Sequence, residues 1–398
     1  TRGTYFRLVE GKNCKEKEQL FLSHIDGNED EQRIFYPNVC QKDFEEIPGC
    51  PTGYWVNART IDIFDSESSM STISRARLGQ NTGDNDRFLR YWFEISYKQI
   101  GRGLTPDYDG ISYKWVPYTK GGVSRKWYST QETIILWLND GEEVKKYCVI
   151  RNHGKHWSRY IQGREFFYKK GIVFPRIGSG TFNTSLVPEG SIFDVNAPAC
   201  FEVEVMTYQL AFLNSIVARH LLSILCPTLT FQVGDVSKLP FKIQTSESTD
   251  TIENNTEQNI SISKQDWNAH EISWDFQRNE LVRQQLQVVL FEMQDRGVMS
   301  EDATIDEIGS FHLPELMQPI EILLEKYKAE WEDAFHQLHA NEEELNRQFI
   351  HIYGLQDELT PDVPLEEITI LQQGEISIED GRIVWHDDVV IKQLVSYA

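Results

Sequence analysis

The spacing of apolar residues changes near residue 245, and this change constrains the fold more than any other feature of the chain. Between Leu89 and Phe241, short runs of β-branched and aromatic residues alternate with Gly, Asn, Asp and Pro, which is typical of strands. One stretch within this region, residues 204–225, has helical spacing and ends before Pro227. Residues 264–297 and 314–353 are amphipathic at helical period. The sequence therefore predicts an α+β protein, with a mixed, strand-rich domain followed by a mainly α-helical C-terminal domain.

Charge divides the chain at nearly the same places. The net charge is −22 over 398 residues, yet residues 73–245 carry +7, from 22 Lys and Arg against 15 Asp and Glu. Residues 1–72 carry −5 and residues 246–398 carry −24. A basic region between acidic ones indicates a centre that binds a polyanion. Residues 246–263 are polar and poor in apolar side chains, so we expect a linker or mobile loop there.

The segment from Trp115 to Tyr128, WVPYTKGGVSRKWY, is the strongest candidate for a binding loop. It combines three cations, four aromatic residues and the pair Gly121-Gly122, and it contains no acid. The glycines allow a tight turn and a close approach to a ligand, while Lys and Arg suit phosphates and guanine edges. An ordinary surface hairpin accounts for the same composition, so both readings stay open. We expect Trp115 and Trp127 to be core residues rather than stacking residues.

Several functional classes lack their motifs in this sequence. It contains neither GxxxxGK[ST] nor a GxGxxG that opens a helix after a strand. The six cysteines form no CxxC pair, which argues against a zinc ribbon or disulfide framework and favours a reducing cytoplasm. His153 and His156 have no carboxylate or cysteine at ligand spacing, so no metal site is expected. No apolar run reaches the roughly 20 residues of a membrane span, and no membrane partner is expected.

Six segments, one of which contains the candidate loop, stand out in order along the chain: QNTGDNDRFLRYWFEI (80–95), KWVPYTKGGVSRKWY (114–128), NDGEEVKKY (139–147), CPTLTFQVGDVSKLP (226–240), SISKQDWNAHEISWDF (261–276) and IYGLQDELTPDVPLEEITI (352–370). Together they resemble the C-terminal half of PglX-type adenine-specific DNA methyltransferases from BREX phage-exclusion systems. The last two segments are specific to that family, whereas the first resembles many fused restriction–modification enzymes.

The sequence also departs from the family's catalytic pattern. Such an enzyme needs an [N/D/S]PP[Y/F] motif to hold the flipped adenine and a Gly-rich turn to hold S-adenosylmethionine. This sequence contains no Pro-Pro dipeptide and no such turn. The resemblance therefore implies a chain without the catalytic domain, in which residues 1–72 are a connector, 73–245 a target-recognition domain and 264–398 an acidic helical domain. We expect this chain alone to bind no cofactor and to transfer no methyl group, while the whole protein uses S-adenosylmethionine.

Double-stranded DNA is the partner that the resemblance implies. Asp84 is expected to cap a turn by accepting backbone N–H groups rather than to contact phosphate. The residues expected to contact DNA are polar or basic, with one tyrosine and the two glycines of the loop: Asn81, Thr82, Asn85, Arg87, Lys114, Tyr118, Lys120, Gly121, Gly122, Arg125, Lys126, Arg151, Lys155, Arg159 and Arg176.

Two rival classes remain. In the first, the chain is an interaction scaffold whose acidic helices dock another BREX subunit, and the basic centre is incidental. A phage inhibitor that mimics DNA is a further partner to consider under either reading. In the second, the chain is a nuclease, which ranks last because the sequence shows no cluster of metal-binding carboxylates.

Overall fold

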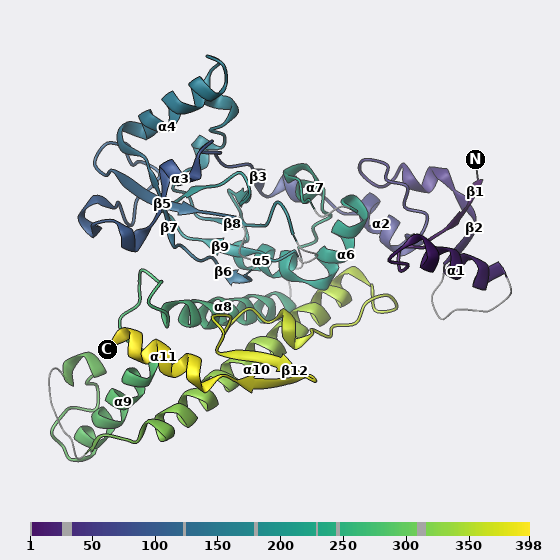
Figure 1. Cartoon of the computed structure of the whole chain (residues 1–398). Helices are drawn as coiled ribbons and strands as arrows, with labels where there is room; N and C mark the ends of the chain where they lie inside the picture. The colour runs from purple at the N-terminus through teal and green to yellow at the C-terminus, as the bar shows by residue number, and fades with distance from the viewer. Residues whose placement is uncertain are drawn as a thin grey trace.

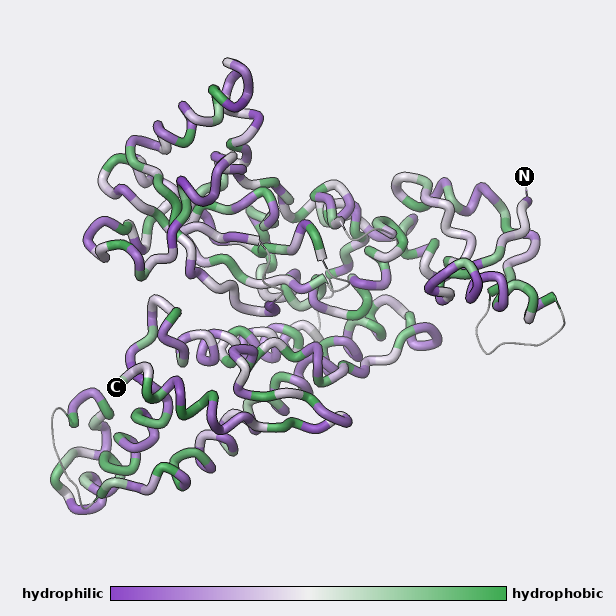
Figure 2. The backbone as a smooth tube through the Cα atoms, viewed as in Figure 1, coloured by the Kyte–Doolittle hydropathy of each residue, from purple (hydrophilic) through white to green (hydrophobic). Residues whose placement is uncertain are grey.

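The computed structural model describes residues 2–25, 34–121, 125–178, 182–227, 230–243, 247–308 and 316–398. Figure 1 shows a small N-terminal lobe, a central region that contains two sheets, and a layer of long helices beneath that region. Hydrophilic and apolar residues are mixed along each long helix (Figure 2), as expected for helices with one buried face. The predicted α+β class with a helical C-terminal region is confirmed.

The N-terminal lobe is a two-stranded antiparallel sheet with a helix beside it. β1 (Arg2–Phe6) pairs with β2 (Phe35–Cys40), and the helix beside this sheet is α1 (Cys14–Ile25). The ring of Phe6 lies 4.8 Å from that of Phe21, which joins α1 to the sheet. The chain then enters α2 (Ala58–Ser66), where the side chain of Asn57 accepts a hydrogen bond from the Thr60 N–H at 2.8 Å.

A four-stranded sheet forms one half of the central region. Its order is β10-β5-β7-β4, with β5 and β10 parallel and the other pairs antiparallel. Two helices adjoin it, and the short α3 leads directly into β4. The bounds are α3 (Asn85–Phe88), β4 (Leu89–Tyr91), β5 (Trp115–Thr119), β7 (Thr133–Leu136), α4 (Leu138–Arg151) and β10 (Ile192–Phe193).

A five-stranded sheet forms the other half, in the order β3-β11-β8-β9-β6. Only the β6–β9 pair is parallel. The strands are β3 (Arg75–Arg77), β6 (Trp127–Tyr128), β8 (Gly171–Val173), β9 (Ser185–Val187) and β11 (Ala199–Phe201). Trp115 and Trp127 are 6% and 1% exposed, so the prediction that both belong to the core is confirmed.

The helix expected at 204–225 is present but divided. α5 (Met206–Asn214) and α6 (Ile216–Leu225) are separated by Ser215, whose backbone is extended. The Asn214 side chain exchanges two hydrogen bonds with the Thr184 backbone, and Ile216, the residue after Ser215, donates its N–H to the Asn346 side chain. The Asn346 side chain thus satisfies the first N–H of α6, and this contact from a distant residue lies beside a break that apolar spacing alone does not reveal.

The C-terminal helices share a hydrophobic core with the central region. α9 (Glu280–Asp295) and α10 (Ile320–Tyr353) correspond to the two predicted amphipathic stretches, and α7 (Val233–Ser237) precedes them. The ring of Phe212 in α5 stacks on Tyr353 in α10, with centroids 5.5 Å apart. The Tyr353 hydroxyl also donates to the carbonyl of Pro240. The two predicted domains therefore do not have separate cores.

The linker or mobile loop expected at 246–263 is wrong for the residues that the structure describes there. These residues form most of α8 (Glu247–Asn268), which lies against α5, β6 and α10. Its buried stripe is largely polar: Ile252, Thr256, Asn259, Ser263 and Asp266 recur at helical spacing and are at most 1% exposed. Asn341 of α10 donates to Asn259 at 2.8 Å, so part of this polar stripe is satisfied by a facing helix. The polar composition predicted a solvated segment, but this helix buries amide, hydroxyl and carboxylate groups instead of apolar ones.

The chain ends in a hairpin and a helix that return to α8 and α10. These are β12 (Ile376–Glu379), β13 (Arg382–Trp385) and α11 (Asp387–Tyr397). His270, just after α8, lies 2.6 Å from the buried carboxylate of Glu375. Burial opposes the charged form of His270, but the bond to Glu375 and the charge of Asp266 outweigh it, so the pKa of His270 is raised.

We expect the variant His270→Gln to lose stability in a pH-dependent way. Because the folded-state pKa of His270 is raised, its contribution is fully present below the unfolded-state pKa of about 6.5 and is lost as the pH rises through the folded-state pKa. Urea unfolding of wild type and variant should therefore differ more at about pH 6 than at about pH 9. An equal difference at both pH values would contradict the assigned ion pair.

Candidate nucleic-acid interface

Arg125 and Lys126, two residues expected to contact DNA, are buried in the structure. Arg125 donates to the carbonyl of Ser263 and to the carboxylate of Asp266, each at 2.6 Å. The Lys126 ammonium lies 2.5 Å from the carboxylate of Glu342 on α10, and both side chains are at most 4% exposed. These contacts correct the expectation: in this structure both charges are neutralised inside the protein, so neither side chain is offered to a duplex.

Glu342 is a buried acid on the acidic helix α10, and it is 4% exposed. One carboxylate oxygen of Glu342 accepts from Lys126, and the other accepts from the Trp127 indole N–H at 2.8 Å. Trp127 has a φ of 71°, which an L-residue adopts only under restraint. Thr369 accepts a third bond, from the Lys126 N–H, at 3.0 Å. We call Arg125, Lys126, Trp127, Asp266 and Glu342 the buried clamp, because they join β6 to α8 and α10.

The turn before α3 exposes another group of predicted residues. The Asn81 side chain accepts the Gly83 N–H at 2.8 Å, while the hydroxyl of the buried Thr82 donates to the Asn85 side chain at 2.6 Å. Asp84 accepts the Arg87 N–H at 3.1 Å as the N-cap of α3, which confirms its predicted capping role. Asn81, Asn85 and Arg87 are exposed. The turn is thus fixed by its own side chains while it presents three of them to solvent.

The C-terminal end of α4 lies against this turn. The Arg151 guanidinium donates to the Gly83 carbonyl at 2.6 Å, and the Arg87 guanidinium lies 5.2 Å from the centre of the Tyr147 ring. A hydrogen bond with Tyr147 raises the pKa of Arg151, so this cation stays charged at physiological pH. Burial also raises the pKa of Cys148, one residue further along α4, so its thiol stays protonated and inert. Tyr147 therefore positions two cations, a role that neither composition nor spacing signalled.

Two more predicted cations belong to the loop that follows α4. Lys155 and Arg159 are exposed, and this loop joins the Asn81 turn through a bond from the Asn81 N–H to the Tyr160 carbonyl at 2.7 Å. We call Arg87, Arg151, Lys155 and Arg159 the basic surface. Among the residues that the structure describes, none of these four cations forms an ion pair. By contrast, nearby Lys145 and Arg164 are both paired with Asp140.

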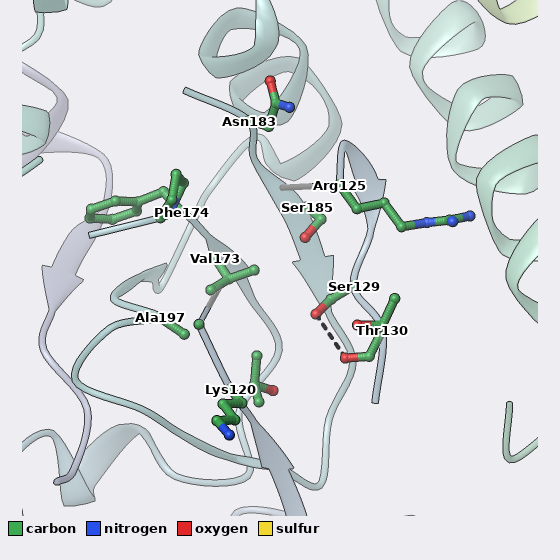
Figure 3. A pocket seen from close by; sticks show the side chains of 12 residues that line it. Lys120, Arg125, Ser129, Thr130, Val173, Phe174, Asn183, Ser185 and Ala197 are labelled. Carbon is green, nitrogen blue, oxygen red and sulfur yellow. Dashed lines mark hydrogen bonds between the residues drawn. The ribbon is translucent and has the colours of Figure 1, made fainter. Parts of the chain in front are cut away.

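The loop around Asn196 connects three more predicted residues to the turn before α3: Lys120, Gly121 and Arg176. Lys120 is exposed and Arg176 is partly exposed, and both adjoin the loop around Asn196. A side chain on Gly121 would meet the Asn196 carbonyl at 2.2 Å, so this glycine is needed for a close approach, although to the protein's own backbone. The loop continues to Val195, whose N–H donates to the carbonyl of Gln80. Figure 3 shows Lys120 at one end of a small cleft and Arg125 extending away from it toward the helices.

The remaining predicted residues are not brought to this surface. Lys114 is exposed but precedes β5, so it lies at the opposite end of that strand from Lys120. Tyr118 is 1% exposed and donates to Asp194 at 2.6 Å, and burial with the charge of Asp194 raises its pKa well above the usual value. Tyr118 is therefore a core residue and not a DNA contact. Gly122 lies outside the described residues.

The described residues contain no group of three His, Cys, Asp or Glu side chains arranged to hold a metal ion. Within the same ranges, no helix combines the length and the apolar content needed to cross a bilayer.

Two curated relatives of this chain are named as adenine-specific methyltransferases. No protein-family model matches the chain. The adenine-specific methyltransferase PglX of Lacticaseibacillus casei (strain Zhang) is 33% identical over 371 residues, covering 92% of this chain and 28% of that protein. The adenine-specific methyltransferase BrxX of Escherichia coli O9:H4 (strain HS) is 32% identical over 285 residues, covering 70% of this chain and 21% of that protein.

Among solved structures, the type IIL restriction-modification enzyme MmeI in complex with DNA gives a TM-score of 0.35 at 10% identity, covering 74% of this chain and 34% of that one. A likeness of this size carries no conclusion about what this chain binds.

The sequence similarities define the class of protein to which this chain is related, the adenine-specific methyltransferases. More narrowly, the chain is related to a part of the PglX type, which confirms the resemblance found in its sequence. It spans less than a third of the length of these relatives.

Proposed function

We propose that this chain recognises duplex DNA on behalf of an adenine-specific methyltransferase. The basic surface is the observation that carries this proposal. Three separate segments bring its four exposed cations together, and none of the four is paired with a carboxylate among the described residues. In a chain of net charge −22, unpaired cations gathered on one surface are suited to a polyanion.

The polar side chains beside these cations complete a surface of the kind that DNA-binding proteins use. Lys and Arg neutralise phosphates and fix the register of the protein on the duplex. Asn81 and Asn85 carry amide groups that are able to bond either a phosphate or an adenine edge. The acidic residues 246–398 repel DNA from the rest of the molecule, which favours contact through the basic surface.

The finer function rests on the resemblance and on the relatives' names. In our proposal, the whole protein transfers a methyl group from S-adenosylmethionine to the N6 atom of adenine in a BREX phage-defence system, and this chain supplies sequence recognition. The residues of this chain do not fit the cofactor's site, since they include neither the Pro-Pro motif nor the expected Gly-rich turn. The acidic helices are the proposed contact for other subunits of that system, because their charge is −24 over residues 246–398.

The proposal is tested by duplex binding at several salt concentrations. If each cation of the basic surface neutralises one phosphate, the plot of log affinity against log salt should have a slope of about −4. Affinity should then fall roughly a hundredfold between 50 and 200 mM salt. Fluorescence anisotropy of a labelled duplex measures both quantities. Absence of binding at 50 mM salt would count against DNA recognition by this chain.

A further inference from the structure

The end of β4 and the turn that follows it expose three aromatic side chains. Tyr91, Phe93 and Tyr97 are 50%, 54% and 56% exposed. The rings of Tyr91 and Phe93 stack on each other, with centroids 5.3 Å apart and planes 3° from parallel. Single exposed apolar residues are ordinary, but a stacked and half-exposed pair presents a concentrated aromatic surface.

This turn is held in place by the residues around it. Trp92 lies between the two exposed rings in sequence but faces inward, where it stacks on Trp274 at 5.5 Å and donates its indole N–H to the Ile272 carbonyl at 2.8 Å. The Tyr91 N–H donates to the Glu94 carboxylate at 2.7 Å. The pair is therefore preorganised, and a ligand that stacks on it would lose little entropy by ordering the turn.

The strand register places this aromatic pair near Lys120, which is exposed and is a predicted DNA contact. Tyr91 lies opposite Thr133, and Thr133 lies opposite Tyr118 on the next strand, so Tyr91 and Tyr118 are about 10 Å apart across the sheet. Lys120 follows Tyr118 by two residues at the same end of the sheet. Arg87 of the basic surface precedes β4 and so lies toward the other end of that strand, at most about 14 Å from Tyr91 along the chain. These spans are close to the width of one major groove, about 12 Å.

The charge around the turn favours a nucleic acid over an apolar protein partner. Lys98 is exposed, and the structure gives it no ion pair with any residue that it describes. The Glu94 carboxylate keeps its negative charge while it accepts the Tyr91 N–H, so the excess of cations near the turn comes from Lys98 together with Lys120. Aromatic rings combined with free cations are the usual elements of surfaces on which bases stack.

We propose that the stacked pair Tyr91–Phe93 is a second contact for DNA, which binds bases that have left the helical stack. This inference rests on the proposed function, since it assumes that the chain meets DNA at the basic surface. Adenine methylation requires the target base to leave the duplex, and unstacking has a free-energy cost. A stacking surface beside the recognition contacts would offset part of that cost for a disrupted base.

The test compares the 398-residue chain with the variant Tyr91→Ala/Phe93→Ala on two labelled DNAs, a perfect duplex and the same duplex with a short unpaired bubble. We expect the wild type to prefer the bubble by about tenfold, and the variant to lose that preference, because one stacked base contributes on this scale. The salt dependence should stay unchanged, since no cation is removed. Fluorescence of 2-aminopurine in the bubble should report stacking in the wild type and not in the variant.

Two controls keep this test specific. Phe291→Ala removes another exposed ring, 69% exposed on α9, and should leave the bubble preference intact. Tyr91→Phe keeps the ring and should retain the preference.

The outcomes distinguish the stacking contact from DNA recognition itself. If the wild type binds the duplex but Tyr91→Ala/Phe93→Ala binds both DNAs as the wild type does, the stacking contact is wrong while DNA recognition stands. If the wild type binds neither DNA, the proposed function itself is wrong. If the variant instead loses a co-purifying protein and keeps the bubble preference, the turn is a protein contact and our inference fails.

Discussion

Reversing three cations of the basic surface, in the variant Arg87→Glu/Lys155→Glu/Arg159→Glu, is expected to weaken duplex binding by on the order of a hundredfold at moderate salt. If these cations contact phosphates as proposed, each reversal removes one contact and adds a repulsive charge. The slope of log affinity against log salt should also become shallower by about three. Arg151 is left unchanged because its guanidinium holds the Gly83 carbonyl and so supports the turn itself. Anisotropy titrations of wild type and variant measure both effects.

A matched control separates local contact from net charge. Lys15→Glu/Lys42→Glu/Lys326→Glu makes the same change in charge at exposed positions on α1, beside β2 and on α10. This control should lose much less affinity, because charges further than a Debye length of about 10 Å from the DNA are screened. Equal losses in the two triple variants would show that binding follows overall charge, and the basic surface would then not be the interface.

Lys126→Met is expected to lower the free energy of unfolding by about 3–5 kcal/mol, because it leaves the carboxylate of Glu342 buried without its cation. The double variant Lys126→Met/Glu342→Gln should recover part of this loss. A glutamine is neutral, and its amide oxygen is still able to accept the Trp127 indole N–H that Glu342 now accepts. Urea unfolding of the wild type and both variants gives the three free energies.

This second experiment also decides between two roles for Lys126. If it belongs to the buried clamp, Lys126→Met should destabilise the fold while the protein that remains folded binds DNA with unchanged affinity. If it contacts DNA, as its sequence context suggested, the variant should keep its stability and lose affinity. The second pattern would contradict the buried ion pair.

Features set by neighbouring residues were predictable from the sequence. Asp84 stands three residues before Arg87 in a turn rich in Asn and Gly, and it caps α3 as expected because an N-cap depends on local geometry. The helix ending at Tyr353 was predictable for the same reason, since its apolar stripe is continuous and Gly354 follows with a left-handed φ of 67°.

Features set by distant partners were not predictable in this way. Lys126 and Lys155 are both lysines in the basic region, yet the first meets a carboxylate 216 residues away and the second meets solvent. No local pattern distinguishes them. The helix α8 was missed for a related reason, because hydrophobic periodicity detects apolar stripes and its buried positions carry Thr, Asn, Ser and Asp. The sequence did contain a regular pattern, since small polar side chains recur at helical spacing along α8.

The buried clamp limits how this protein can be recombined. A recognition region cut after residue 243 would keep Arg125 and Lys126 but leave Asp266 and Glu342 behind, so two cations and an indole would be stranded on an apolar surface. Chimeras between relatives should therefore keep the sheets and the helices together, and α2 with them, because Ile63 and Phe64 of α2 belong to the same hydrophobic core and Arg59 donates to the Tyr353 carbonyl.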